Sequence, residues 1–316
     1  MKAVVLDKPT NGEDIILSEI PVPIVKPGWV LVKVKAFGMN HSEQILRREE
    51  IRYDYIKKPI VPGIECVGEI EDASDSGFKK GQKVVALMGG MGRSFNGSYA
   101  EYALLPSHHV FSVECDLTWE GLAAVPETYF TAWGSLFECL NLCGDDTLLI
   151  RGASCALGVV TIQLAKALGC KVIATTHKEK YVSHLSNADD IILDDGTLAG
   201  KVVGVTKALD LVGPKNLLDT LSAVEKGGIV CQTGILGGVY DLNGFDPIKD
   251  IPNGVYLTGF FSNYPTQKVM DEIFTFINSH KLKPIYGQVF PFEKIGDAIQ
   301  MQDSGTAGGK IVVVVD

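Results

Sequence analysis

The first 117 residues alternate short apolar runs with glycine- and proline-containing breaks, which is the pattern of an all-β unit. Within residues 30–36, Lys33 and Lys35 alternate with valines, which predicts a strand with one buried face and one exposed face. Similar apolar runs predict strands over residues 66–70, 83–87 and 99–103. One helix is predicted to interrupt this unit, over residues 42–49, where Ile45 and Leu46 form a small apolar face.

After residue 117 the pattern changes to an alternation of helices and short apolar strands. Strands are predicted over residues 148–150, 171–175, 191–193, 208–212, 228–231 and 255–261, and helices over residues 129–142, 157–168, 178–186 and 215–224. Short apolar strands separated by helices are typical of a parallel sheet that is covered on both faces. This part is therefore predicted to be a doubly wound α/β domain.

The C-terminal segment is too short for a third domain. It is predicted to contain an amphipathic helix with apolar residues at positions 269, 273, 276 and 277, followed by a strand over 288–290, a helix over 295–301 and a last strand over 310–315. We expect this segment to pack on the β unit. The predicted domains are therefore residues 1–118 together with 265–316, and residues 119–264.

Composition and charge limit the possible partners. With 46% hydrophobic and 21% charged residues, the chain has the composition of an ordinary globular protein. The excess of 38 acidic over 29 basic residues gives a formal charge of −9, which opposes binding to nucleic acid or to anionic membranes. No apolar run approaches the roughly 20 residues of a membrane span, and residues 2–6 are too short for a signal-peptide core. Seven cysteines without a C-x-x-C pair fit a reducing compartment, so a cytoplasmic protein is expected.

A candidate nucleotide site follows the predicted strand 148–150. The chain continues there through small residues into a helix, and backbone N–H groups at such a helix start can bind a pyrophosphate. The candidate contacts are Gly152, Ala153, Ser154, Leu157 and Gly158. Of the three glycines of a G-x-G-x-x-G motif only Gly158 is present, at the position where helix and strand pack closely. An ordinary strand–turn–helix without a ligand remains the alternative.

The end of the next strand points to the type of nucleotide. NAD-binding domains place an acidic residue near this point, against the ribose 2′-hydroxyl. Here the chain has Thr176, His177 and Lys178 instead, which supply hydrogen-bond donors and positive charge for a 2′-phosphate. We therefore expect NADPH as the cofactor. The alternative for Lys178 is a solvated residue at the start of a helix.

Several motifs together resemble one enzyme family. They are found at residues 36–43, 62–65, 97–102, 131–135, 152–158, 234–238 and 308–313. In this order and spacing they resemble the medium-chain dehydrogenase/reductase superfamily, and specifically its zinc-free quinone oxidoreductase branch, over essentially the whole chain. The resemblance implies an α/β protein in which a GroES-like β domain is joined to a Rossmann domain with a doubly wound parallel sheet.

The resemblance also indicates that both zinc sites of the metal-dependent relatives are absent. The positions matching the catalytic zinc ligands hold Asn40, Ile64 and, approximately, Glu127. A catalytic zinc needs three protein ligands and an open position, which asparagine and isoleucine do not supply in place of a thiolate and an imidazole. Residues 88–96, where the structural zinc lobe would be inserted, contain no cysteine.

The same resemblance implies roles for further residues. Asn40 is expected beside the nicotinamide end of the cofactor, with Glu43 replacing the supporting aspartate of relatives; a helix-capping role is the alternative. Tyr53 lies where some enone reductases supply a proton donor, with plain packing as the alternative. Lys310 is expected to approach the cofactor, or else to be a strand-edge lysine. The remaining candidates for cofactor contacts are Thr131, Gly234, Ile235, Phe260 and Phe261, of which the last four end two strands at the carboxyl edge of the sheet.

The function predicted from these features is metal-independent hydride transfer from NADPH to a quinone or an α,β-unsaturated carbonyl. The alternative is an NADPH-binding sensor or structural protein of the same fold without catalysis. A homodimer is also predicted, because the strand at 255–261 should lie at a sheet edge and lacks the charges that usually protect an edge. The sequence does not indicate which quinone or enone is the substrate.

Overall fold

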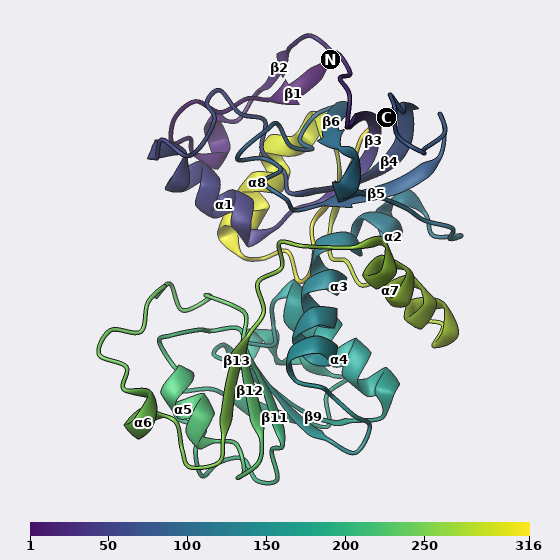
Figure 1. Cartoon of the computed structure of the whole chain (residues 1–316). Helices are drawn as coiled ribbons and strands as arrows, with labels where there is room; N and C mark the ends of the chain where they lie inside the picture. The colour runs from purple at the N-terminus through teal and green to yellow at the C-terminus, as the bar shows by residue number, and fades with distance from the viewer. The chain divides into compact units, whose positions relative to one another are not determined.

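The computed structural model describes residues 1–316 and divides into two compact units (Figure 1). The first unit comprises Met1–Phe130 and Asn263–Asp316, and the second comprises Thr131–Ser262. The sequence analysis placed the first boundary after residue 118. The structure instead groups the short helix α2, Trp119–Ala123, and the start of α3, Pro126–Trp133, with the first unit.

The first unit is built around a mixed seven-stranded sheet with the order β14-β15-β3-β4-β5-β7, in which β6 pairs with β3. All pairs are antiparallel except β14 with β15. The strands are β3 Trp29–Gly38, β4 Glu65–Asp72, β5 Lys83–Leu87, β6 Tyr102–Pro106, β7 Val110–Ser112, β14 Val289–Pro291 and β15 Val312–Val314. Because β15 pairs with β3, the C-terminal segment returns to the β unit, as the sequence predicted.

The alternation in β3 has the predicted effect. Val30, Val32 and Val34 are buried in the core, whereas Lys33 and Lys35 are half-exposed. The predicted strand at 99–103 is displaced, because Tyr99 and Ala100 pair with the N-terminal strand β1, Lys2–Val4, before β6 begins.

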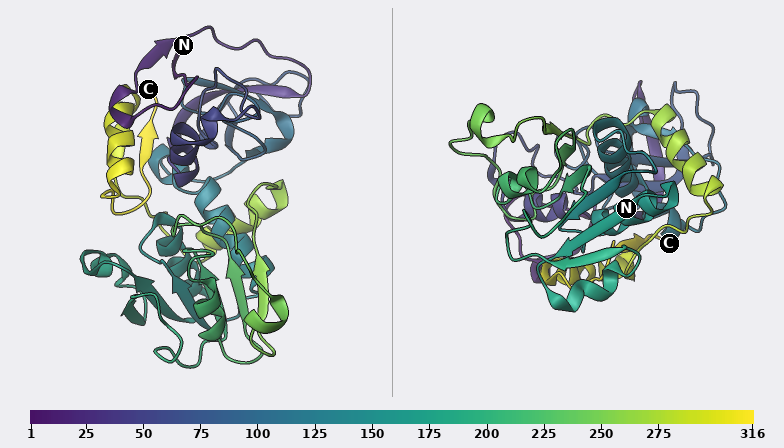
Figure 2. Two further views of the ribbon diagram at one scale, coloured as in Figure 1. Left: turned by 90° about the vertical axis from the view of Figure 1, so that its left-hand side faces the viewer. Right: turned by 90° about the horizontal axis from the view of Figure 1, so that it is seen from below.

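Helices and short strands complete the first unit. Strand β2, Leu17–Glu19, pairs with β1. The helices are α1 His41–Arg48, α7 Gln267–Ser279 and α8 Ile295–Ser304. There are also 3₁₀ turns at Gly12–Asp14, Glu50–Arg52, Ser107–His109 and Phe292–Lys294. Figure 2 shows α8, in yellow, beside the first of these turns, in purple. The N-terminal and C-terminal segments of the chain are thus packed together.

The second unit contains six parallel strands in the order β10-β9-β8-β11-β12-β13. They are β8 Thr147–Arg151, β9 Lys171–Thr176, β10 Asp190–Leu193, β11 Lys207–Asp210, β12 Ile229–Gln232 and β13 Tyr256–Gly259. Helix α4, Ala156–Leu168, joins β8 to β9, and α5, Leu217–Ser222, joins β11 to β12 on the opposite face (Figure 1). A one-turn helix α6, Pro247–Asp250, precedes β13. The strand order reverses between β8 and β11, so the doubly wound sheet is confirmed.

Two predicted helices take a different form. The helix predicted over 129–142 is α3 followed by a π-helical turn, Gly134–Cys139, where the Phe260 ring packs so closely that a Cβ on Gly134 would lie 2.0 Å from it. The helix predicted over 178–186 consists of 3₁₀ turns, Glu179–Leu185, in which only Leu185 is buried. So little apolar contact does not stabilise a regular α-helix.

Strand β13 ends the six-stranded sheet, as predicted, and Tyr256 on it is 61% exposed. None of the helices is long and apolar enough to cross a lipid bilayer. All seven cysteines are free thiols.

Candidate functional site

In the first unit, Asn40 lies where β3 meets α1 and is the N-cap of that helix. Its side-chain Nδ2 donates to Glu65 Oε1 at 2.8 Å, and its Oδ1 accepts from Lys310 Nζ at 2.5 Å. Its main-chain oxygen accepts from Gln302 at 2.8 Å. The capping position that the sequence left as an alternative is therefore present, and the Asn40 side chain is also part of a polar cluster.

Glu65 and Lys310 form a buried ion pair beside Asn40. Lys310 Nζ lies 2.5 Å from Glu65 Oε1, and neither side chain is more than 2% exposed. The other Glu65 oxygen accepts from the main-chain N–H of Glu127 at 2.8 Å. Because a buried charge without its partner destabilises a protein by about 3–5 kcal/mol, this pair is a fixed part of the unit.

Lys310 precedes β15 and is buried. Its ammonium group contacts Asn40 Oδ1, Glu65 Oε1 and Thr128 Oγ1, the last at 2.8 Å. A lysine has three N–H donors, so these three oxygens satisfy it completely. A contact with a cofactor phosphate would therefore require Lys310 to break one of these bonds.

Glu43 connects the same cluster to the start of α1. Its carboxylate accepts from the main-chain N–H groups of Asn40, at 2.8 Å, and Ile64, at 3.0 Å. The longer side chain thus still supports Asn40 where relatives have aspartate. Burial, followed by the negative charge of Glu65, raises the pKa of Glu43 to about 7. The main-chain N–H groups of Ile64 and of Glu43 itself, together with the charge of Lys310, oppose the shift.

Glu43→Gln should remove a pH dependence from the stability of this unit. The folded-state pKa of about 7 lies above the ordinary value of 4.5, so the folded chain binds this proton more tightly than the unfolded chain does. Glu43 therefore contributes about 3 kcal/mol to the free energy of unfolding below pH 4.5, and this contribution is lost as the pH rises through 7. Urea unfolding at pH 5 and pH 8 measures it. The exposed Glu13→Gln is the control, and an equal pH dependence in wild type and Glu43→Gln would contradict the assignment.

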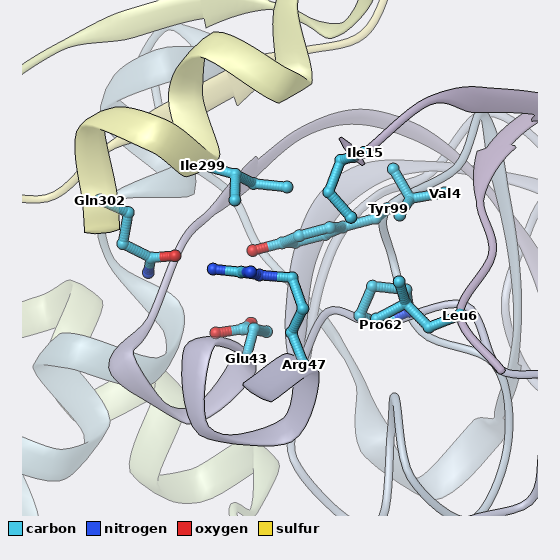
Figure 3. Close-up of a pocket in the computed structure, with 9 residues that line it drawn as sticks. All are labelled: Val4, Leu6, Ile15, Glu43, Arg47, Pro62, Tyr99, Ile299 and Gln302. Atoms are coloured by element: carbon cyan, nitrogen blue, oxygen red, sulfur yellow. The ribbon is translucent and has the colours of Figure 1, made fainter. Parts of the chain in front are cut away.

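A small cavity lies beside Glu43, between α1 and α8 (Figure 3). Arg47, Tyr99 and Gln302 line it together with apolar side chains, and the hydroxyl group of Tyr99 points toward the guanidinium group of Arg47. Arg47 in turn binds both carboxylate oxygens of Asp303, at 2.5 and 2.6 Å. The cavity volume of about 10 Å³ has room for a single water molecule and not for an organic substrate.

The positions that match zinc ligands do not form a metal site. Asn40 is bonded to Glu65 and Lys310, Ile64 is a buried apolar residue, and the Glu127 carboxylate lies 4.0 Å from Lys310 Nζ. No group of three or more histidine, cysteine, aspartate or glutamate side chains in the structure could hold a metal ion. These donors do not fit the tetrahedral coordination of a catalytic zinc.

Tyr53 lies outside the Asn40 cluster. It follows the 3₁₀ turn Glu50–Arg52, is 57% exposed, and stacks on Tyr55 with ring centroids 5.8 Å apart. The structure therefore does not bring the two predicted catalytic residues, Asn40 and Tyr53, into one hydrogen-bonded cluster.

In the second unit, a tight turn joins β8 to the start of α4. Gly152 has a φ of +80°, and its N–H donates to Thr175 Oγ1 at 3.1 Å. A Cβ on Gly158 would lie 2.3 Å from the carbonyl oxygen of Ala153, so the turn packs against the helix too closely for any side chain there. Leu157 and Gly158 lie in the first turn of α4, a 13-residue helix whose N-terminus favours an anion.

The end of β9 lies next to this turn. Thr176 Oγ1 donates to Ser154 Oγ at 3.1 Å, which links the two predicted parts of the nucleotide site. His177 and Lys178 follow and are exposed. The pKa of His177 is lowered by partial burial and by the positive charges of Lys178 and Lys215, while Asp194 opposes the shift. Lys215 therefore adds a positive charge near His177, in addition to the residues found from the sequence.

The remaining candidates lie at the same carboxyl edge of the sheet or near it. Gly234 and Ile235 follow β12, and Phe260 and Phe261 follow β13, with Phe261 the more exposed of the two rings. Thr131 is buried in α3, where its main-chain oxygen accepts from Ser135 Oγ at 2.7 Å.

Two family models match the chain, in separate parts of its sequence. The "Alcohol dehydrogenase GroES-like domain" matches residues 26–115, and "Zinc-binding dehydrogenase" matches residues 187–313. The chain belongs to the medium-chain dehydrogenase/reductase superfamily. This confirms both the family and the fold class predicted from the sequence, a GroES-like β domain and a Rossmann-like parallel sheet.

Known members of the medium-chain dehydrogenase/reductase superfamily match nearly the whole chain. Human quinone oxidoreductase is 29% identical over 94% of this chain and 92% of its own length. An acryloyl-coenzyme A reductase from Sulfurisphaera tokodaii is 26% identical over 99% of both chains. A mycobacterial protein whose structure was determined in complex with NADPH has a TM-score of 0.85, with 24% identity over 99% of this chain and all of its own. The chain is thus an oxidoreductase of this superfamily that is similar to quinone oxidoreductases.

Among the residues that the structure brings to the candidate sites of this medium-chain dehydrogenase/reductase, Glu65 and Lys215 were not predicted from the sequence. Glu65 was part of a matching motif, but no signal paired it with Lys310. Lys215 was noted only as the start of a helix, and its place near His177 depends on the reversal of strand order in the sheet.

Proposed function

We propose that this protein transfers a hydride from NADPH to a quinone or an α,β-unsaturated carbonyl compound without the help of a metal ion. The main support is that Asn40 and Ile64 occupy the positions of zinc ligands, and that Asn40 is bonded to Glu65 and Lys310 instead. Without a Lewis acid, an ordinary alcohol has nothing to lower its pKa before it loses hydride. A quinone or enone needs less help, because hydride addition gives a delocalised phenolate or enolate.

The cofactor would be bound by the second unit. When bound, NADPH supplies the hydride. The turn with Gly152, Ala153 and Ser154 and the start of α4 would bind the pyrophosphate, and Thr176, His177 and Lys178 the 2′-phosphate. We assign further cofactor contacts to Thr131, Gly234, Ile235, Phe260 and Phe261. The mycobacterial structure in complex with NADPH supports the choice of cofactor.

Asn40 would stabilise the negative charge that develops on the acceptor oxygen. Lys310 fixes the orientation of its amide, and one Nδ2 hydrogen is directed to Glu65 at 2.8 Å. The distance from Nδ2 to Glu43 Oε1 is 3.5 Å, so the second hydrogen is only weakly bonded and can be donated to a substrate oxygen. Tyr53, or a water molecule, would supply the proton.

The substrate class has support from two relatives. Their names refer to a quinone and to acryloyl-coenzyme A, and both compounds contain a carbonyl group conjugated to a double bond.

The test is NADPH oxidation by the purified protein with a panel of quinones and enones, with zinc measured in the same sample by elemental analysis. We expect turnover with these acceptors and no stoichiometric zinc. About one tightly bound zinc per chain, lost together with activity, would contradict the metal-independent reaction.

A non-catalytic NADPH-binding protein is the second candidate. Two observations favour it: the N–H donors of Lys310 are all bonded within the protein, and Tyr53 is exposed. Few polar groups are then available to take part in a reaction. Stopped-flow measurement separates the two functions: bound NADPH that is not oxidised by any member of the panel would support the second.

We also propose a homodimer formed by β13. This strand ends the six-stranded sheet, and its neighbour β12 satisfies only one of its two edges. Pairing with β13 of a second copy about a two-fold axis would complete the hydrogen bonding. Sedimentation at micromolar concentration should therefore give a dimer, and Leu257→Pro should shift it toward monomer. A wild-type monomer would reject the proposal.

A further inference from the structure

Arg151 is a fully buried arginine at the end of β8, directly before Gly152. Its guanidinium group binds Asp194 through two parallel bonds, from Nε at 2.8 Å and from Nη2 at 3.0 Å. Its Nη1 donates to Asp219 Oδ2 at 2.7 Å, and also to Thr220 Oγ1 and to the main-chain oxygen of Asn216, each at 3.0 Å. The guanidinium group thus joins the chain segments that follow β8, β10 and β11.

Asp194 lies close to the residues assigned to the 2′-phosphate. Its main-chain N–H donates to the carbonyl oxygen of Thr176 at 2.8 Å, and the charge of its carboxylate acts on the pKa of His177. Dinucleotide-binding sheets that prefer NAD place an acidic side chain against the ribose 2′-hydroxyl. Here the nearby acid comes from the segment after β10 instead of from the end of β9, so it was not visible as part of the sequence motif.

A free carboxylate at this place would repel a 2′-phosphate. Arg151 prevents this repulsion in two ways. Its two parallel hydrogen bonds turn both Asp194 oxygens toward the guanidinium group, and the positive charge of the guanidinium group compensates the negative charge of the carboxylate. Asp219 is held by the same guanidinium group and by the main-chain N–H of Leu198 at 2.8 Å. The positive charges of Lys178 and Lys215 are then not opposed by an unpaired acid.

We propose that Arg151 determines the cofactor preference of this protein by withdrawing Asp194 from the ribose position. Arg151 is a positioning residue in this role, since it acts on the nucleotide through Asp194 and the loops it joins. The inference rests on the proposed NADPH-dependent function and adds to it the residue that selects the phosphorylated cofactor.

Three variants test this role: Arg151→Met, Asp194→Asn and the double variant. The readout is the dissociation constant for NADPH and for NADH, measured by quenching of protein fluorescence at low and at moderate salt. In Arg151→Met the unpaired Asp194 should weaken NADPH binding on the order of 30-fold and NADH binding less than about 5-fold, most strongly at low salt. Asp194→Asn alone should keep the NADPH preference, and the double variant should restore it to within about 3-fold of wild type.

The change in preference, and not the loss of affinity, distinguishes this role from a purely structural one. A loosened loop weakens both nucleotides alike, whereas an unmasked carboxylate penalises the 2′-phosphate. If Arg151→Met does not fold, Arg151→Lys retains the positive charge but not the two parallel bonds, and it should lose part of the preference. Equal losses for both nucleotides in the folded variant, or a double variant that stays impaired for NADPH alone, would overturn the proposal.

The wild-type titration separates failure of this inference from failure of the proposed function. A wild-type chain that binds neither nucleotide overturns both. A wild-type chain that prefers NADPH, together with an unchanged preference in the Arg151 variants, overturns only the role of Arg151.

Discussion

Lys178→Ala weakens NADPH binding about 10- to 100-fold and changes NADH binding less than about 2-fold, if the end of β9 binds the 2′-phosphate. Lys178 is exposed and follows Thr176, whose hydroxyl bonds to Ser154 in the phosphate-binding turn. A charge-assisted hydrogen bond to a phosphate contributes about 1.5–3 kcal/mol, which corresponds to this range of affinities. Direct titration of both nucleotides measures the effect, and the wild type should bind NADPH more tightly than NADH.

A neighbouring lysine provides the matched control. Lys178 directly precedes the 3₁₀ segment Glu179–Leu185, and Lys180 lies within it. The ammonium groups of both lysines lie over the Tyr181 ring, at 5.9 Å from its centroid for Lys178 and 4.8 Å for Lys180. Lys180→Ala changes the net charge equally, so a similar loss of NADPH affinity in both variants would indicate only a general charge effect. Equal wild-type affinities for NADPH and NADH would show that the assignment of Thr176, His177 and Lys178 is wrong.

The parallel unit could be predicted from sequence because most of its strands contain a short apolar run. Strands buried on both faces are mostly apolar, and the helices between them show their own spacing of apolar residues. The predictions failed where tertiary contacts override local preference. The Phe260 ring against Gly134 accompanies a π-helical turn at the end of α3, and the segment Glu179–Leu185 has too little apolar surface for an α-helix.

The candidate sites were predictable only where their residues follow one another in the chain. The turn at 152–158 and the end of β9 are local patterns, and the structure places them side by side. In contrast, Asn40 and Lys310 are 270 residues apart in sequence and meet because the last strand returns to β3. The pairing of Arg151 with Asp194 likewise crosses β9, and no local pattern in either segment indicates it. Long-range polar pairs of this kind depend on the sheet order, which periodicity does not specify.

Tyr53→Phe should slow turnover about 100-fold or more with a conjugated carbonyl substrate, if this phenol donates the proton that accompanies hydride transfer. General acid catalysis by one side chain contributes about 10²- to 10⁴-fold. Because Tyr53 lies in the first unit and the cofactor contacts are assigned to the second, NADPH affinity should remain nearly unchanged. Steady-state kinetics with an enone, combined with an NADPH titration, measures both quantities.

Tyr55→Phe is the matched control, because the Tyr55 ring stacks on Tyr53 with an angle of 13° between the planes and is 59% exposed, close to the 57% of Tyr53. Both variants keep the two aromatic rings, so a role in stacking alone predicts little effect from either change. A proton donor at Tyr53 predicts a large effect only in Tyr53→Phe. Unchanged turnover in Tyr53→Phe would remove this residue from the mechanism and leave a water molecule as the proton source. Rapid oxidation of ethanol-like alcohols by the metal-free protein would contradict the proposed substrate class as a whole. Conjugated carbonyl compounds were inferred as substrates because a simple alcohol should need a Lewis acid before it can lose hydride.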